Sequence, residues 1–256
     1  MQAKSPICPK KKQRELIFDR DVLTCEYHSA MLAGLSLIGD ALIEKCKLGH
    51  KLSILVLGTG AGVFSMFLRH HFGSHLDSLV TVDINPNMVK VATENFGFHP
   101  DDILKSEIAD AYQFVASQKP ESYDIVVLDV NYEEDDLKVS PPKKYFEPDF
   151  ISSLHRIAKP NALIAFNSII DEAHKSKLHT QLKQVKDSVK FVTKSQNDKN
   201  EIILFAKGSA VKAIDEGQKR LQQLTKVCEA YGLNKSIFLS KKNMQVVYHT
   251  DAMRRL

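Results

Sequence analysis

The sequence predicts an α/β fold: a Rossmann-like, seven-stranded, mostly parallel β-sheet that ends in an antiparallel hairpin and carries helices on both faces. Two observations predict it. Short runs of valine, isoleucine and leucine alternate with amphipathic stretches, as expected for parallel strands that are buried on both faces and joined by helical crossovers. The last two apolar runs are connected only by polar residues, which favours a hairpin there.

Seven apolar runs are the predicted strands, and the third of them is the weakest. They cover residues 52–57, 78–82, 103–108, 123–129, 162–166, 189–192 and 201–206. Helices are predicted between the first six runs, at about residues 62–71, 86–96, 110–117, 148–158 and 172–186. Pro86 and Pro148 suit a first helical turn, where a missing N–H costs nothing.

Helical patterns also flank this core. Before it, apolar side chains recur every three or four residues from Met31 to Leu42, which predicts one helix over residues 27–46 that caps the sheet. After it, residues 211–231 are amphipathic. The predicted division is a basic flexible arm at 1–14, a capping segment at 15–50, the core at 51–210 and a helical C-terminal appendage at 211–256.

Composition is that of an ordinary globular protein: of 256 residues, 43% are hydrophobic and 26% charged. No apolar run approaches the roughly 18 residues of a membrane span, and the N-terminus lacks the apolar stretch of a secretory signal. The four cysteines are scattered, which fits a reducing compartment and argues against a zinc site. We therefore expect a cytoplasmic protein without membrane contact.

The net charge of +4 is mild. The densest basic cluster, Lys10-Lys11-Lys12 with Arg14, lacks interleaved aromatic residues, so a solvated arm is favoured over a nucleic-acid contact. The ten histidines show no metal-ligand spacing, and His70-His71 is interpreted as a structural pair at a helix C-terminus. The sequence therefore predicts neither a metal site nor a nucleic-acid partner.

A glycine-rich turn follows the first predicted strand, with glycines at Gly58, Gly60 and Gly62 and Thr59 between the first two. Glycine supplies the positive φ and close backbone approach of a tight strand-to-helix turn, and the next helix offers free N–H groups. Dinucleotide enzymes use a different spacing, G-x-G-x-x-G, with the third glycine one residue later. The alternative is a plain structural turn.

Three carboxylates stand at or just after the ends of predicted strands. Asp83 ends the second run, where it can accept the ribose hydroxyls of a nucleoside that lies over the glycine turn. Asp110 follows the third run and can accept from an adenine amino group, cap the next helix, or do both. Asp129 ends the fourth run, at the sheet edge where ligands bind in such folds.

Near Asp129 the sequence offers further polar groups. Asn131 follows two residues later and precedes an acidic stretch at 132–136. A carboxylate and an amide side by side could orient an amine, and the acidic stretch could attract a basic substrate. The alternatives are a loop cap for Asp129 and a solvated loop for the acidic stretch. His28 begins the capping helix, so it is a candidate for facing the same cleft.

With these residues identified, the chain resembles a known family. The segments CEYHSAMLAGL, LVLGTGAG, VDINPNM, ADAYQF, YDIVVLDVN, SPPKKYFEPDF and NEIILFA are similar, in the same order, to the C-terminal module of the dual lysine and N-terminal methyltransferases of translation elongation factor one-alpha. That module is related to spermidine synthase. The resemblance runs from about Val22 to the tail.

The resemblance implies an S-adenosyl-L-methionine-dependent methyltransferase core. It implies cofactor binding by Gly58, Thr59, Gly60, Gly62, Asp83, Ile84, Asp110 and Ala111. It also implies a catalytic Asp129 and substrate contacts by Asn131, Tyr27 and His28. The family often has glutamate where Asp83 stands, which is a mild change. It also often has a second acid where this chain has Asn131, and the lack of that acid here weakens a two-carboxylate mechanism.

The predicted reaction is methyl transfer to an N-terminal α-amine of a protein, with an elongation-factor-like protein as partner. An α-amine with a pKa of about 7.7–8.0 is roughly a tenth to a quarter neutral at physiological pH, whereas a lysine near 10.4 is only about 0.1% neutral. One carboxylate therefore suffices to align it. The rival interpretations are polyamine aminopropyl transfer, small-molecule methylation and a non-catalytic binding module. Spermidine synthases carry a glutamate where this chain has Tyr27-His28-Ser29-Ala30, which disfavours the first.

Overall fold

The computed structural model describes residues 18–23, 25–131, 140–169, 172–184, 188–194, 200–208, 217–238 and 253–255. The predicted basic arm at 1–14 and the acidic stretch at 132–136 lie outside these residues, as do residues 211–216 of the predicted C-terminal helix.

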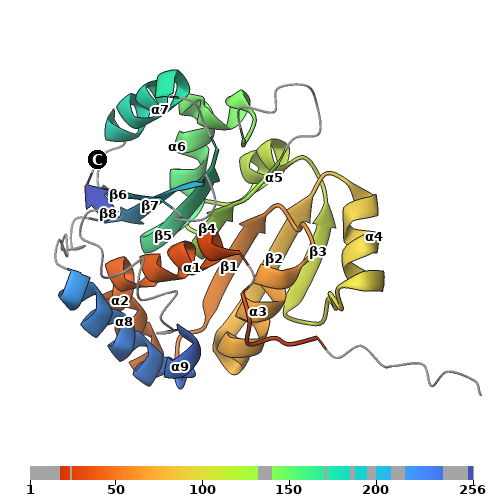
Figure 1. Cartoon of the computed structure of the whole chain (residues 1–256), viewed down its shortest axis with the longest axis vertical. Coiled ribbons are helices and arrows are strands. Elements are labelled where there is room, and N and C mark those ends of the chain that lie inside the picture. The colour runs from red at the N-terminus through yellow and green to blue at the C-terminus, as the bar shows by residue number, and fades with distance from the viewer. Residues whose placement is uncertain are drawn as a thin grey trace, which may run out of the picture.

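One mixed sheet organises the described chain (Figure 1), in the order β3-β2-β1-β4-β5-β7-β6-β8. Its strands are β1 (Leu52–Leu57), β2 (Leu76–Asp83), β3 (Leu104–Ile108), β4 (Tyr123–Leu128), β5 (Ala158–Ser168), β6 (Ser188–Lys194), β7 (Glu201–Lys207) and β8 (Met253–Arg255). Strands β1 to β5 pair in parallel. The predicted Rossmann-like α/β fold is therefore confirmed.

The antiparallel end of the sheet confirms one expectation and corrects another. Strand β7 runs antiparallel to both β5 and β6, so the predicted hairpin is present. The described sheet has eight strands rather than the predicted seven, because β8 adds to the outer edge of β6. Only three residues long, β8 pairs through its backbone and carries no apolar run that could reveal it in the sequence.

Helices cover both faces of the sheet, as predicted (Figure 1). The α-helices are α1 (Glu26–Ala33), α2 (Gly39–Lys47), α3 (Val63–Phe72), α4 (Pro86–Asn95), α5 (Ala111–Ser117), α6 (Pro148–Ile157), α7 (Glu172–Gln184), α8 (Gly217–Tyr231) and α9 (Lys235–Phe238); short 3₁₀ turns are η1 (Gly34–Ile38), η2 (Gly73–His75) and η3 (Lys143–Phe146). One apolar cluster joins α1, α2, α3 and α8 to the sheet, and a second joins α5, α6 and α7 to its other face.

None of the helices in the described ranges is long and apolar enough to cross a membrane.

The capping segment departs from the single helix predicted over residues 27–46, since it is divided into α1, η1 and α2. Two glycines, Gly34 and Gly39, begin η1 and α2. A Cβ on Gly34 would lie 3.0 Å from a methyl group of Leu204 in the sheet, and a Cβ on Gly39 would lie 2.5 Å from Gln223 in α8. The segment thus lies directly against the sheet at Gly34 and against α8 at Gly39, where a larger side chain would not fit.

Helix α8 packs against this segment and forms two hydrogen bonds with it. The Gln223 amide donates to Asp40 Oδ1 at 2.6 Å, and the Tyr231 hydroxyl donates to the Leu42 carbonyl at 2.9 Å. The N-terminal and C-terminal flanks of the core therefore form one layer, and that layer holds α1 at the carboxyl edge of the sheet (Figure 1).

Candidate functional site

A cavity of about 430 Å³ opens at the carboxyl ends of strands β1 to β4. The strand order reverses between β1 and β4, which is the position where ligands bind in open α/β sheets. Its volume is in the range of small-molecule sites. Eight predicted site residues line it: Gly58, Gly60, Asp83, Ile84, Asp110, Ala111, Asp129 and Asn131.

The glycine turn forms the floor of the cavity next to Asp129. Gly58 has a φ of 101°, which favours glycine, and a Cβ there would lie 2.0 Å from the Asp129 carbonyl oxygen. Thr59 and Gly62 do not line the cavity. The Thr59 hydroxyl bonds that of Thr81 at 2.7 Å, and a Cβ on Gly62 would lie 2.5 Å from the Phe98 ring. These two predicted residues shape the turn from behind.

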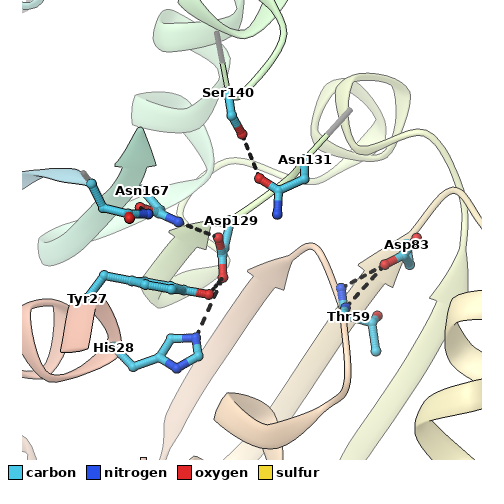
Figure 2. Close-up of polar contacts among 10 residues, drawn as sticks. Tyr27, His28, Thr59, Asp83, Asp129, Asn131, Ser140 and Asn167 are labelled. Carbon is cyan, nitrogen blue, oxygen red and sulfur yellow. Dashed lines mark hydrogen bonds and ion pairs between the residues drawn. The ribbon is translucent and has the colours of Figure 1, made fainter. Parts of the chain in front are cut away.

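Asp83 is held rigidly above the turn (Figure 2). Its Oδ2 accepts from the backbone N–H groups of Thr59 at 3.0 Å and Gly60 at 3.3 Å, and its Oδ1 accepts from that of Asn85 at 2.9 Å. Asn85 itself caps α4. A carboxylate has about four lone-pair sites, so Asp83 keeps acceptor capacity for donors that enter the cavity.

Both carboxylate oxygens of Asp110 accept hydrogen bonds that define its role in the described structure. Its Oδ1 accepts from the Tyr112 N–H at 2.7 Å and so caps α5, as predicted. Its Oδ2 accepts from Lys144 Nζ, also at 2.7 Å. Burial alone would raise the pKa of Asp110, but the Lys144 hydrogen bond and the capping N–H groups outweigh it and lower that pKa. Lys144 comes from η3, lines the cavity, and was missed as a site residue.

Asp129 is the centre of a polar cluster (Figure 2). The Tyr27 hydroxyl donates to its Oδ2 at 3.1 Å, and His28 Nε2 lies 3.6 Å from the same oxygen. The His28 ring stacks on Phe64, with the ring centroids 4.7 Å apart. Burial and the negative charge of Asp129 raise the pKa of Tyr27, so its hydroxyl stays protonated and donates. The first turn of α1 thus meets the chain just after β4, although Tyr27 and His28 are not among the residues that line the cavity.

Two asparagines that sequence reasoning missed complete this cluster. Asn167, in β5, donates from its side-chain amide to Asp129 Oδ1 at 2.7 Å, and the Asn200 side-chain amide donates to Asn167 Oδ1 at 2.7 Å. Both are buried, with exposed fractions of 6% and 7%. No local pattern marks them, because they meet only through the antiparallel pairing of β5 with β7.

Asn131 lies on the other side of Asp129 (Figure 2). Its side-chain oxygen accepts from the Ser140 hydroxyl at 2.6 Å, and the same hydroxyl donates to the Val130 carbonyl at 3.1 Å. Ser140 therefore orients the Asn131 amide at the cavity wall. The structure brings the predicted carboxylate and amide together across the mouth of the cavity.

A family model described as a methyltransferase domain matches residues 48–230. Curated relatives are named eEF1A lysine and N-terminal methyltransferase. The human protein is 31% identical over 192 residues, which cover 72% of this chain and 27% of that protein. The mouse protein is 33% identical over 156 residues, which cover 59% of this chain and 22% of that protein. The chain thus spans about a quarter of the length of these relatives.

Among solved structures, human methyltransferase-like protein 13 in complex with SAH aligns with a TM-score of 0.69 at 28% identity, over 82% of this chain and 94% of that one. A probable spermidine synthase from Corynebacterium glutamicum aligns with a TM-score of 0.59 at 18% identity, over 84% of this chain and 74% of that one. At this low identity, the similarity to the spermidine synthase shows a shared fold and no more.

The residues of the cavity fit an S-adenosyl group. A Cβ on Gly58 would fill the turn, Asp83 retains acceptor capacity, and Ile84 presents a 67% exposed apolar side chain at the cavity wall. The chain belongs to the methyltransferase domain family, and S-adenosyl-L-methionine is its cofactor.

Proposed function

We propose that the chain is a protein N-methyltransferase and that its acceptor is the N-terminal α-amine of a protein similar to translation elongation factor one-alpha. The observation that carries this proposal is the Asp129 carboxylate, which borders the cavity beside the glycine turn and accepts hydrogen bonds from Tyr27 and Asn167. The names of the curated relatives support the choice of acceptor.

In this proposal each part of the cavity holds one part of the cofactor. The backbone of Gly58 and Gly60 lies along its methionine end, and Gly62 shapes the turn behind them. Asp83 accepts from the ribose hydroxyls with the lone pairs that its backbone partners leave. Asp110 and Ala111 contact the adenine, and Ile84 packs on its face. Bound in this way, S-adenosylmethionine supplies an electrophilic methyl group on a sulfonium.

Asp129 then acts on the acceptor. A neutral amine donates an N–H to the carboxylate, which turns the nitrogen lone pair toward the glycine turn. As the N–C bond forms and the S–C bond breaks, positive charge develops on nitrogen, and the fixed carboxylate stabilises it. The released proton goes to water. Asn131 and His28 flank Asp129 and limit how the amine can approach.

An α-amine suits this geometry better than a lysine. It is substantially neutral near pH 7.5, since its pKa is about 7.7–8.0, whereas a lysine at about 10.4 must first be deprotonated by a base. Tyr27 donates to Asp129 rather than accepting a proton, and Asn167 is an amide. These two donors orient the Asp129 carboxylate and take up no proton. His28 Nε2 lies 3.6 Å from the same carboxylate, but the proposal requires no base, because its acceptor is already neutral. Translation takes place in the cytoplasm, which is where the proposal locates the chain.

The test compares acceptors with radiolabelled cofactor. One peptide carries the N-terminal residues of translation elongation factor one-alpha, and its control is the same peptide with an acetylated α-amine. Intact mass should show methyl groups on the first peptide alone. Equal labelling of the acetylated control would shift the acceptor to lysine. Activity only with decarboxylated cofactor and putrescine would replace the proposal with aminopropyl transfer.

A further inference from the structure

Three metal-ligating side chains meet at the C-terminal end of α3, at the opposite end of that helix from the glycine turn. His70 and His71 lie in its last turn, and Asp21 lies in the N-terminal segment 18–23, which passes beside α3 (Figure 1). Asp21 Oδ1 is 3.4 Å from His70 Nε2 and 3.4 Å from His71 Nε2. All three ligand atoms lie within 4.8 Å of one another.

The two carboxylate–imidazole distances suit a tetrahedral ion. Bonds of about 2.0–2.2 Å from zinc to imidazole nitrogen and carboxylate oxygen place neighbouring ligand atoms about 3.3–3.5 Å apart. Both carboxylate–imidazole distances of 3.4 Å fall within this range. We propose that Asp21, His70 and His71 form a binding site for a divalent first-row metal ion of the zinc class.

His71 supplies an independent observation. Its side chain is only 6% exposed, and within the described residues its Nε2 makes no hydrogen bond of regular geometry, although Asp21 Oδ1 lies 3.4 Å from it and the Arg20 backbone bonds the ring. The ring is fixed by Phe67 at a centroid distance of 4.3 Å and by Phe238 at 5.3 Å. A buried imidazole nitrogen that makes no well-formed hydrogen bond is poorly compensated for the hydration that it loses. A metal ion between this atom and Asp21 would satisfy it without moving the ring.

The local electrostatics favour a cation. The C-terminus of a helix carries partial negative charge, and Asp21 adds a full one. The nearby Arg69 is engaged elsewhere, because its Nε donates to Asp101 Oδ2 at 2.8 Å. His70 and Asp21 are about half exposed, so water can complete the coordination of the ion.

The proposed ion would anchor the segment that leads into α1. That segment already contacts the loop after α4, where Arg20 donates to the Gly97 carbonyl and the Phe18 ring packs on Gly97. Helix α1 begins at Glu26 and carries Tyr27 and His28 into the Asp129 cluster. The ion would therefore have a structural role and take no part in methyl transfer.

The test uses the full chain, freed of any histidine tag and treated with a chelator, titrated with Zn²⁺ by calorimetry and with Co²⁺ by visible absorption. We expect one equivalent of each to bind, with the intense Co²⁺ bands of a tetrahedral site and a higher thermal unfolding midpoint. The variants Asp21→Ala and His70→Ala change half-exposed side chains and should keep the fold. Each should weaken binding by about tenfold or more, since even indirect changes at metal sites cost about 10–100-fold.

The matched control is His50→Ala, which removes an exposed histidine outside the cluster and should bind Zn²⁺ as the unaltered chain does. Equal affinity in the unaltered chain and Asp21→Ala, or no binding in any of them, overturns the proposal. S-adenosylmethionine affinity is measured on the same samples. If the metal-free chain still binds S-adenosylmethionine, absence of zinc binding counts against the metal site alone and leaves the methyltransferase proposal standing.

Discussion

The side-chain amide of Asn167 donates a 2.7 Å hydrogen bond to Asp129 Oδ1 and is itself held by the amide of Asn200 at 2.7 Å. This buried chain of amides fixes the direction of the carboxylate before any acceptor arrives. It makes Asn167 a positioning residue for the proposed reaction, because it acts on the amine only through Asp129.

The variant Asn167→Ala should lower kcat by about 10- to 100-fold, since a hydrogen bond to a charged group is worth about 1.5–3 kcal/mol. The KM for S-adenosylmethionine should stay nearly unchanged. Asn200→Ala should cause a smaller loss, and the double variant should be no worse than Asn167→Ala, because both residues act through one contact. If the losses of kcat in the two single variants added up in the double variant, Asn200 would not act through Asn167.

Asp129→Asn preserves the shape of the side chain and removes its charge. We expect kcat to fall by about 10²- to 10⁴-fold, which is the range for residues that act directly on a reacting group. Cofactor affinity by calorimetry should change little. Asp77→Asn, at an exposed position of β2, is the control and should keep full activity. Normal turnover by Asp129→Asn would remove this residue from the mechanism.

Asp83→Ala should weaken S-adenosylmethionine binding by about tenfold or more. It removes the proposed acceptor for the ribose and leaves the N–H groups of Thr59, Gly60 and Asn85 without their carboxylate. Asp83→Glu should retain most of the affinity, because the resembling family often has glutamate there. Calorimetric titration measures both. Unchanged affinity in Asp83→Ala would show that the cofactor lies elsewhere.

The glycine turn offers a matched pair of substitutions. Gly60→Ala meets no heavy atom within 4 Å and bears only the cost of a positive φ, about 1–2 kcal/mol. Gly58→Ala has the same kind of cost and also places its Cβ 2.0 Å from the Asp129 carbonyl oxygen, which adds about 1–3 kcal/mol or more of overpacking. Urea denaturation should therefore show a clearly larger loss for Gly58→Ala. Equal losses would contradict the close approach of the turn to Asp129.

Lys144→Met should change the pH dependence of cofactor binding more than its strength. A half-exposed ion pair is worth only about 0–1 kcal/mol, so affinity at neutral pH should change by less than about fivefold. Lys144 helps to hold the pKa of Asp110 below its ordinary value of 3.8, so its removal raises that pKa. As the pH is lowered, the Asp110 carboxylate of the variant should therefore become protonated at a higher pH than that of the unaltered chain. Cofactor affinity that depends on this carboxylate should be lost at that higher pH. Titrations between about pH 2.5 and 6 cover the region around the ordinary pKa of 3.8 and measure the shift. Identical profiles would exclude the Lys144 contact.

The sequence by itself determined the fold class and most of the cavity. Apolar runs identify strands β1, β4 and β7 most clearly, because a strand buried on both faces must be apolar throughout. Strand β3 has only one buried residue and gives the weakest signal. Parallel strands bring their carboxyl ends to one edge of a sheet. Residues that end those strands or follow them closely, such as Gly58, Asp83, Asp110 and Asp129, therefore gather around one cavity.

The tertiary structure decided which partners those residues have. Tyr27 reaches Asp129 across 102 residues of sequence, and Asn167 reaches it across 38. Asp21 meets His71 only because the segment before α1 passes over the end of α3. Such contacts follow from how helices and strands pack, and single side chains at loop and strand ends carry no periodic pattern that would reveal them.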